Sequence, residues 1–179
     1  MDFSSNHFEL FGLPARFAVD RSALDRAFRE LQGEVHPDKF AHAGDAEQRV
    51  AMQWATQANE AYVTLKSPLK RARYLLELAG VDVGVETNTA MPPEFLFEQM
   101  EWREAVDEAR KGGNLHELEH LLQRLRSQLD ERYAALGVML DADMKANALA
   151  AAGEVRKLMF LEKLLQDIDE AIAEVEDAL

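Results

Sequence analysis

The sequence has no cysteine among its 179 residues. It therefore has no disulfide, no thiolate ligand for a metal and no cysteine nucleophile. It also lacks an apolar run long enough to span a membrane. The opening residues, Met1-Asp2-Phe3-Ser4, have neither the basic nor the apolar region of a signal peptide. These absences favour a soluble cytoplasmic protein with no membrane attachment.

Basic residues are scarce, and the formal net charge is -13. This balance argues against a nucleic-acid partner, because such partners are bound by basic patches. Residues 1–79 carry 10 Lys and Arg against 11 Asp and Glu, whereas residues 80–179 carry 10 against 22. The apolar fraction of 47% is enough for a packed core. The change in charge near residue 80 predicts a protein built in two parts.

Apolar residues recur throughout the chain at helical spacing, and no segment has the pattern of a β-strand. In the first part this periodicity predicts a short helix at residues 7–11 and three longer helices. The longer helices are expected from the N-cap Asp20 to Val35, from a cap at Asp45 to Leu65, and from Ser67-Pro68 to Gly80.

The second part is expected to contain three further helices. They run from Pro93 to Lys111, from the cap Asn114 to Gly137, and from about Asp141 to the C-terminus. We therefore predict an all-α fold: a small helical domain at residues 1–80, a linker at 81–92 and an antiparallel three-helix bundle at 93–179.

The first part is organised around the turn His36-Pro37-Asp38-Lys39. Pro37 has no backbone N–H and disfavours a helical residue before it, so the preceding helix must end at Val35. The next helix has many alanines on its apolar stripe, which predicts close packing and an antiparallel hairpin with the turn at its tip. Taken alone, the turn could also be an ordinary proline-terminated helix end.

The segments around this turn resemble a J-domain. The matching segments are residues 8–14 (FELFGLP), the turn itself and residues 57–65 (QANEAYVTL). Three later segments are similar to HscB, the J-type co-chaperone of iron–sulfur cluster assembly. They are residues 67–76 (SPLKRARYLL), 95–104 (FLFEQMEWRE) and 155–164 (VRKLMFLEKL). The likeness spans nearly the whole chain, and the absence of an N-terminal cysteine zinc site indicates a bacterial form.

The resemblance implies a co-chaperone that is not an enzyme and has no cofactor or metal. It would stimulate the ATPase of the DnaK-type chaperone HscA and deliver the scaffold protein IscU to it, aiding the maturation of iron–sulfur proteins. The alternative is a J-protein that brings another client to the same class of chaperone. The residues implied in chaperone binding are His36, Pro37, Asp38, Lys39, Arg26 and Arg29.

These residues have the chemistry that such a contact needs. Asp38 offers a carboxylate for a charge-assisted pair with a chaperone arginine, and His36 offers a donor beside it. J-domains usually present a basic second helix to the chaperone. Here the basic residues alternate with Asp25, Glu30 and Glu34, so we expect weak, transient binding.

The helix beginning at Pro93 has a wider apolar arc than packing requires. Phe95, Trp102, Val106 and Ala109 form a sufficient stripe, and further apolar residues lie beside it and continue into an acidic row. An apolar patch bordered by one sign of charge is typical of a protein-binding site. Phe160 lies off the apolar seam of the last helix. The resemblance implies scaffold binding by Leu96, Phe97, Met100, Glu101, Glu104, Glu108 and Phe160.

Two other interpretations of these patterns remain open. Leu96, Phe97 and Met100 could be core residues, and the acidic row could be an ordinary solvated face. His116-Glu117-Leu118-Glu119-His120 fits the H-E-x-x-H pattern of zinc proteases. The leucines around it predict a routine bundle helix with both histidines facing solvent, and the sequence supplies neither a third ligand nor a cleft.

Overall fold

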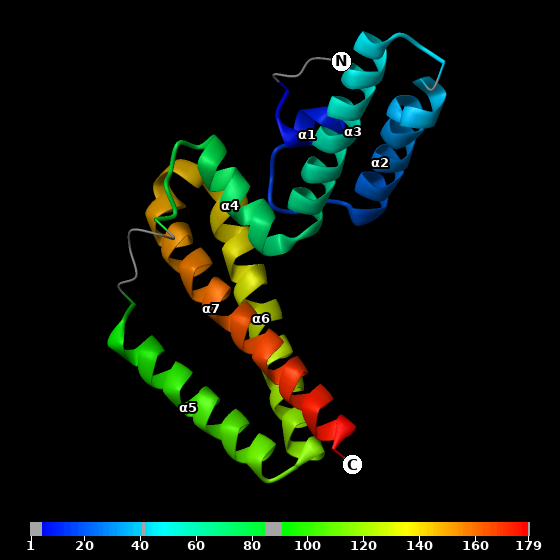
Figure 1. Cartoon of the computed structure of the whole chain (residues 1–179). Helices are drawn as coiled ribbons and strands as arrows, with labels where there is room; N and C mark the ends of the chain where they lie inside the picture. The colour runs from blue at the N-terminus through cyan, green and yellow to red at the C-terminus, as the bar shows by residue number, and fades with distance from the viewer. Residues whose placement is uncertain (1–4, 41, 85–90, 179) are drawn as a thin grey trace. The chain divides into compact units, whose positions relative to one another are not determined.

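The computed structural model describes residues 5–40, 42–84 and 91–178. Within these ranges the chain forms seven α-helices and one 3-10 helix, with no strand, which confirms the predicted all-α fold (Figure 1). The described helices include none long and apolar enough to cross a membrane. Residues 1–4, where a signal peptide was not expected, and residues 85–90 of the predicted linker lie outside the described residues.

The chain divides into two compact units, Met1–Ala79 and Gly80–Leu179. The described residues of the first unit form four α-helices and the 3-10 helix η1. Their bounds are α1 His7–Leu10, α2 Arg21–Val35, η1 Pro37–Phe40, α3 Asp45–Lys66 and α4 Pro68–Leu78.

Side-chain caps define where these helices begin. The Asp20 carboxylate accepts from the backbone N–H groups of Ser22 and Ala23 at 2.9 and 3.2 Å, and the Ser67 hydroxyl caps α4. The predicted cap at Asp45 is wrong by one residue, because Gly44 is the N-cap of α3. As the first residue of the helix, Asp45 instead places its charge at the positive end of the helix dipole.

In the first unit, α2 and α3 pack side by side with η1 at one end of the pair (Figure 1). Leu24, Leu31 and Val35 are buried, as the periodicity of α2 predicts. The Phe28 and Tyr62 rings stack with their centroids 4.0 Å apart, and the Tyr62 hydroxyl donates to Asp25 at 2.9 Å. These contacts join the two helices that lead into and out of the turn.

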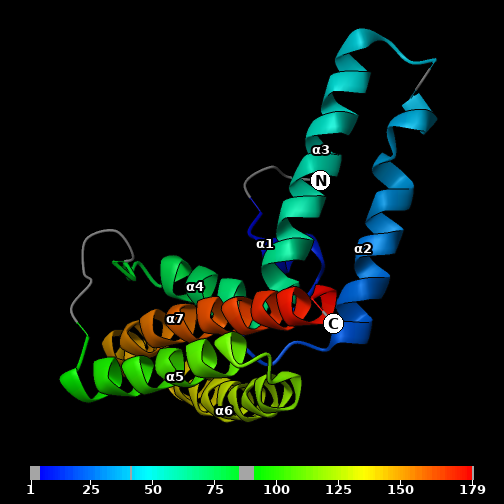
Figure 2. The same cartoon turned by 60° about the horizontal axis from the view of Figure 1, so that its bottom comes forward.

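The second unit is formed by α5 Pro93–Lys111, α6 Leu115–Ala142 and α7 Met144–Asp177. α6 and α7 form a long antiparallel hairpin, and α5 lies along both of them (Figure 2). The helix predicted to end at Gly137 continues to Ala142. One helical glycine costs only about 1 kcal/mol, and burial of Leu136 and Leu140 offsets that cost.

Residues 80–84, at the start of the second unit, are attached to its last helix. The guanidinium of Arg156 on α7 donates from Nη1 to the carbonyl of Val83 at 2.7 Å, and the Val83 side chain is buried. Residues Gly80–Gly84 therefore have a fixed attachment to the second unit.

Candidate functional site

The turn at the end of α2 is held by hydrogen bonds from within. His36 leaves the helix with an extended backbone, at φ -59° and ψ 127°. Its Nδ1 accepts from the backbone N–H of Asp38 at 3.2 Å, and its carbonyl accepts from the N–H of Lys39 at 3.0 Å. Pro37 begins η1 at a position where no backbone donor is required. His36 thus acts as the cap of a short helix that carries Asp38 and Lys39.

The polar groups of this turn are accessible to a partner. The side chains of His36 and Asp38 are 55% and 92% exposed, and Lys39 is exposed as well. The Asp38 carboxylate lies 3.6 Å from Nδ1 of His36. Because Nδ1 accepts the backbone bond, the neutral ring carries its proton on Nε2 and keeps a donor for another molecule.

Arg26 and Arg29 are also exposed, but they lie farther back along α2. Arg29 is seven residues before His36, which is about two helical turns. Its Nε donates to the backbone carbonyl of Asp25 at 3.2 Å. The structure therefore gathers four of the six predicted chaperone-binding residues at the tip and leaves these two arginines on the adjoining helix.

The broad apolar arc of α5 is divided between core and surface. Phe95, Trp102, Val106 and Ala109 are buried, as the first stripe predicts. The neighbouring side chains are exposed, with 65% of Phe97 and 64% of Met100 accessible, and Leu96 is also exposed. The interpretation of these three residues as core is therefore wrong.

Phe160 of α7 contacts α5 at Phe95, the residue before Leu96. Its ring meets the buried Phe95 ring edge to face, with centroids 6.3 Å apart and an angle of 75°, and part of it remains exposed. We refer to Leu96, Phe97, Met100 and Phe160 together as the apolar face.

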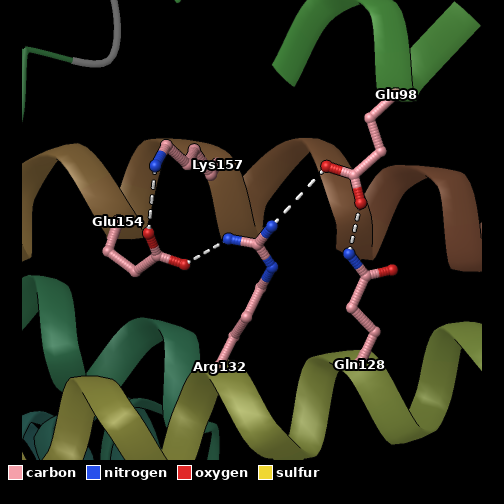
Figure 3. Close-up of polar contacts among 5 residues, drawn as sticks. All are labelled: Glu98, Gln128, Arg132, Glu154 and Lys157. Atoms are coloured by element: carbon pink, nitrogen blue, oxygen red, sulfur yellow. Dashed lines mark hydrogen bonds and ion pairs between the residues drawn. The ribbon is translucent and has the colours of Figure 1, made fainter. Parts of the chain in front are cut away.

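The acidic row continues from this face along α5. Glu101, Glu104 and Glu108 are exposed, and within the part of the chain that the structure describes their side chains form no hydrogen bond or ion pair. Glu98 on another side of the helix differs, because it contacts both Gln128 and Arg132 of α6 (Figure 3). The three glutamates of the row thus keep their charges available to a basic partner.

The H-E-x-x-H segment forms an ordinary face of α6. His116 and His120 are exposed, and His120 lies 4.0 Å from Glu117. Among the described residues, no group of three or more His, Cys, Asp or Glu side chains is arranged to hold a metal ion.

Comparison with known proteins gives a consistent result across sequence and structure. Residues 91–169 match the family model of the HSCB C-terminal oligomerisation domain. The chain is 55% identical, over 177 residues and 99% of both sequences, to the co-chaperone protein HscB homolog of Azoarcus sp. (strain BH72).

Two solved structures have the same fold over most of their length. Chaperone HscB from Vibrio cholerae is 38% identical with a TM-score of 0.83, and the match covers 96% of this chain and 99% of the other. The human co-chaperone protein HscB is 26% identical with a TM-score of 0.85, covering 94% and 83% of the two chains. The family predicted from sequence is confirmed: the chain belongs to the HscB family of co-chaperones, proteins that assist a chaperone and are not themselves enzymes.

Proposed function

We propose that this protein stimulates the ATPase of the DnaK-type chaperone HscA and delivers the iron–sulfur scaffold protein IscU to it. The observation that carries the proposal is that each of the two compact units has an exposed surface suited to binding another protein. One is the turn that presents Asp38, and the other is the apolar face with its acidic row. A protein with two such surfaces can bring a client and a chaperone together.

The turn is the chaperone-binding surface in this proposal. Asp38 is almost fully exposed on a turn that His36 caps, so its carboxylate can pair with an arginine while its backbone stays in place. Arg26, Arg29 and Lys39 add positive charge along the same hairpin. The acidic residues of α2 oppose this attraction, which suits a contact that must release after each cycle.

The apolar face is the client-binding surface. Exposed Leu96, Phe97, Met100 and Phe160 supply area that is buried on binding, and Glu101, Glu104 and Glu108 attract a basic patch on the client. We assign the scaffold protein as this client because the chain belongs to the HscB family. We propose that it meets both partners in the cytoplasm.

In the proposed mechanism, delivery of the client is coupled to ATP hydrolysis by the chaperone. The second unit holds the client while the turn engages the chaperone, and ATP hydrolysis in the chaperone converts it to a state that binds the client tightly. Residues of the turn break no bond in a substrate. They favour the conformation of the chaperone that hydrolyses ATP.

The test is the steady-state ATPase of purified HscA with this protein, in the presence and absence of IscU. We expect stimulation by the protein, a further synergistic increase with IscU, and loss of both effects in His36→Gln. Stimulation that is the same with and without IscU would favour a J-protein with a different client. If the protein stimulated the ATPase of no DnaK-type chaperone, the assignment of the turn as the chaperone-binding surface would be contradicted.

A further inference from the structure

The apolar face is formed by two helices, and a charged network beneath it joins these helices to the third. Arg132 of α6 lies between Glu98 of α5 and Glu154 of α7 (Figure 3). Its Nη1 donates to Glu154 at 2.7 Å, and its Nη2 lies 3.7 Å from Glu98. One guanidinium therefore contacts a carboxylate on each of the other two helices.

Each carboxylate of this network has a second partner. Gln128 donates to Glu98, and Lys157 donates to Glu154 at 3.3 Å (Figure 3). The side chain of Arg132 is only 24% exposed, and that of Glu154 is 15% exposed, so solvent screens these contacts less than it screens surface pairs. The planar, forked guanidinium fixes direction as well as charge, which a single ammonium does not.

The network is also in contact with the aromatic base of the apolar face. The guanidinium carbon of Arg132 lies 5.9 Å from the centroid of the Phe95 ring, and Phe95 meets Phe160 edge to face. Phe95 itself is buried and adjoins the exposed Leu96 in sequence. A continuous set of contacts thus runs from Arg132 through Phe95 to the surface.

We propose that Arg132 is a positioning residue for client binding, which holds α5 and α7 in the relation that places Leu96, Phe97 and Phe160 on one face. This inference rests on the proposed function, because it takes the apolar face to be the client site. Arg132 does not have to touch the client. Its loss would leave every contact residue present while allowing α5 to shift against α7.

A matched control exists on the same pair of helices. Arg110 near the end of α5 forms an ion pair with Glu174 of α7. It lies 12 residues beyond Glu98, which is about 18 Å along the helix. Arg110→Met therefore removes a tie between α5 and α7 without disturbing the part of the helix that carries the apolar face.

The experiment measures the affinity of IscU by calorimetry for the full-length variants Arg132→Met, Arg110→Met, Phe160→Ala and the double variant Arg132→Met/Phe160→Ala. We expect Arg132→Met to raise Kd about tenfold and Arg110→Met to raise it less than about twofold. The double variant should bind within about twofold of Phe160→Ala alone, because both changes disrupt the same contact. General destabilisation would not produce that non-additivity.

Glu98→Gln provides a second test that keeps the size and packing of the side chain. It removes the charge on which Arg132 acts, and we expect it to weaken IscU binding in the same direction without adding to Arg132→Met. Wild-type affinity in Arg132→Met and Glu98→Gln, or additive effects with Phe160→Ala, would overturn the positioning role. Wild-type affinity in Phe160→Ala, with a folded protein, would instead overturn the client site and this inference with it.

Discussion

The Nδ1 atom of His36 accepts a hydrogen bond from the backbone N–H of Asp38 at 3.2 Å. This contact makes the imidazole an N-cap for the short helix that begins at Pro37. It orients the backbone that carries the exposed carboxylate, and it leaves Nε2 as the ring's donor. The histidine therefore has two separable roles, one in shaping the turn and one in contacting a partner.

Substitutions at His36 can separate these roles. Asparagine places its side-chain oxygen where Nδ1 lies and preserves the cap, whereas glutamine places its amide nearer the position of Nε2 and loses the cap. If holding Asp38 in place is the main role, His36→Asn should retain several-fold more stimulation of the HscA ATPase than His36→Gln. Loss of the cap costs about 1 kcal/mol locally. Greater retention in His36→Gln than in His36→Asn would show that the donor at Nε2 matters more than the cap.

Asp38→Asn should reduce stimulation of the chaperone ATPase by at least about tenfold, because it removes the charge that pairs with an arginine. The side chain is 92% exposed, so the free energy of unfolding should change by less than about 0.5 kcal/mol. IscU binding, measured by calorimetry, should remain unchanged. Asp45→Asn removes the same charge from the start of α3 and serves as the control. A similar loss in Asp45→Asn would mean that net charge, rather than the turn, drives stimulation.

Elements whose signals are local could be predicted from sequence. Pro37 ends α2 in any context, and the caps at Asp20, Ser67 and Asn114 require only nearby amides. The end of α6 could not be placed, because Gly137 lies next to residues that pack against α7. Tertiary burial of Leu136 and Leu140 decides that the helix continues.

The exposed patch on α5 could be predicted from sequence, because a bundle helix needs only a limited apolar arc. Leu96, Phe97 and Met100 lie outside that arc. The network at Arg132 gives no such signal. Its members are on three helices, 22 residues or more apart for the pairs that cross between helices. Charged residues beside a leucine seam usually face solvent, so only the packing of the three helices reveals that these contact one another.

Replacement of Phe97 by alanine should weaken IscU binding about tenfold, since exposed aromatic side chains in a compact patch tend to carry much of the binding energy. Stability should hardly change, because 65% of the side chain is already exposed. Leu149→Ala is the matched control: its side chain on α7 is 84% exposed and lies outside the apolar face. Calorimetry on both variants distinguishes a specific face from general surface hydrophobicity. Comparable losses in the two would contradict the assignment.

The acidic row should contribute mainly to the rate of association. Changing Glu101, Glu104 and Glu108 to glutamine should slow binding to IscU and flatten its dependence on salt, since exposed charges steer partners and are screened over about 10 Å at 0.1 M salt. A control triple variant at Glu119, Asp130 and Glu131 changes net charge equally on exposed positions of α6. Stopped-flow rates at several salt concentrations provide the measurement. If both triples respond alike, the attraction depends on overall charge rather than on the row.

His7 gives the first unit a dependence on pH. Its ring stacks on Tyr74 with centroids 4.2 Å apart, and burial lowers the pKa of His7 below its usual 6.5, an effect that Glu60 and Glu77 oppose. Between that lowered pKa and about 6.5, the unfolded chain binds more protons at this position than the folded one. The stabilising contribution is therefore complete above about pH 6.5 and is lost as pH falls through the folded pKa.

His7→Phe should reduce this pH dependence, because phenylalanine keeps the ring on Tyr74 and has no titrating group. The urea midpoint of the first unit should fall less between about pH 7.5 and 5.5 in the variant than in the wild type. Trp54 reports on this unit when Trp102, which belongs to the second unit, is replaced by phenylalanine in both proteins. The other titratable groups of the first unit are common to both chains, so the difference isolates His7. Parallel pH profiles would show that burial of this imidazole does not matter to folding.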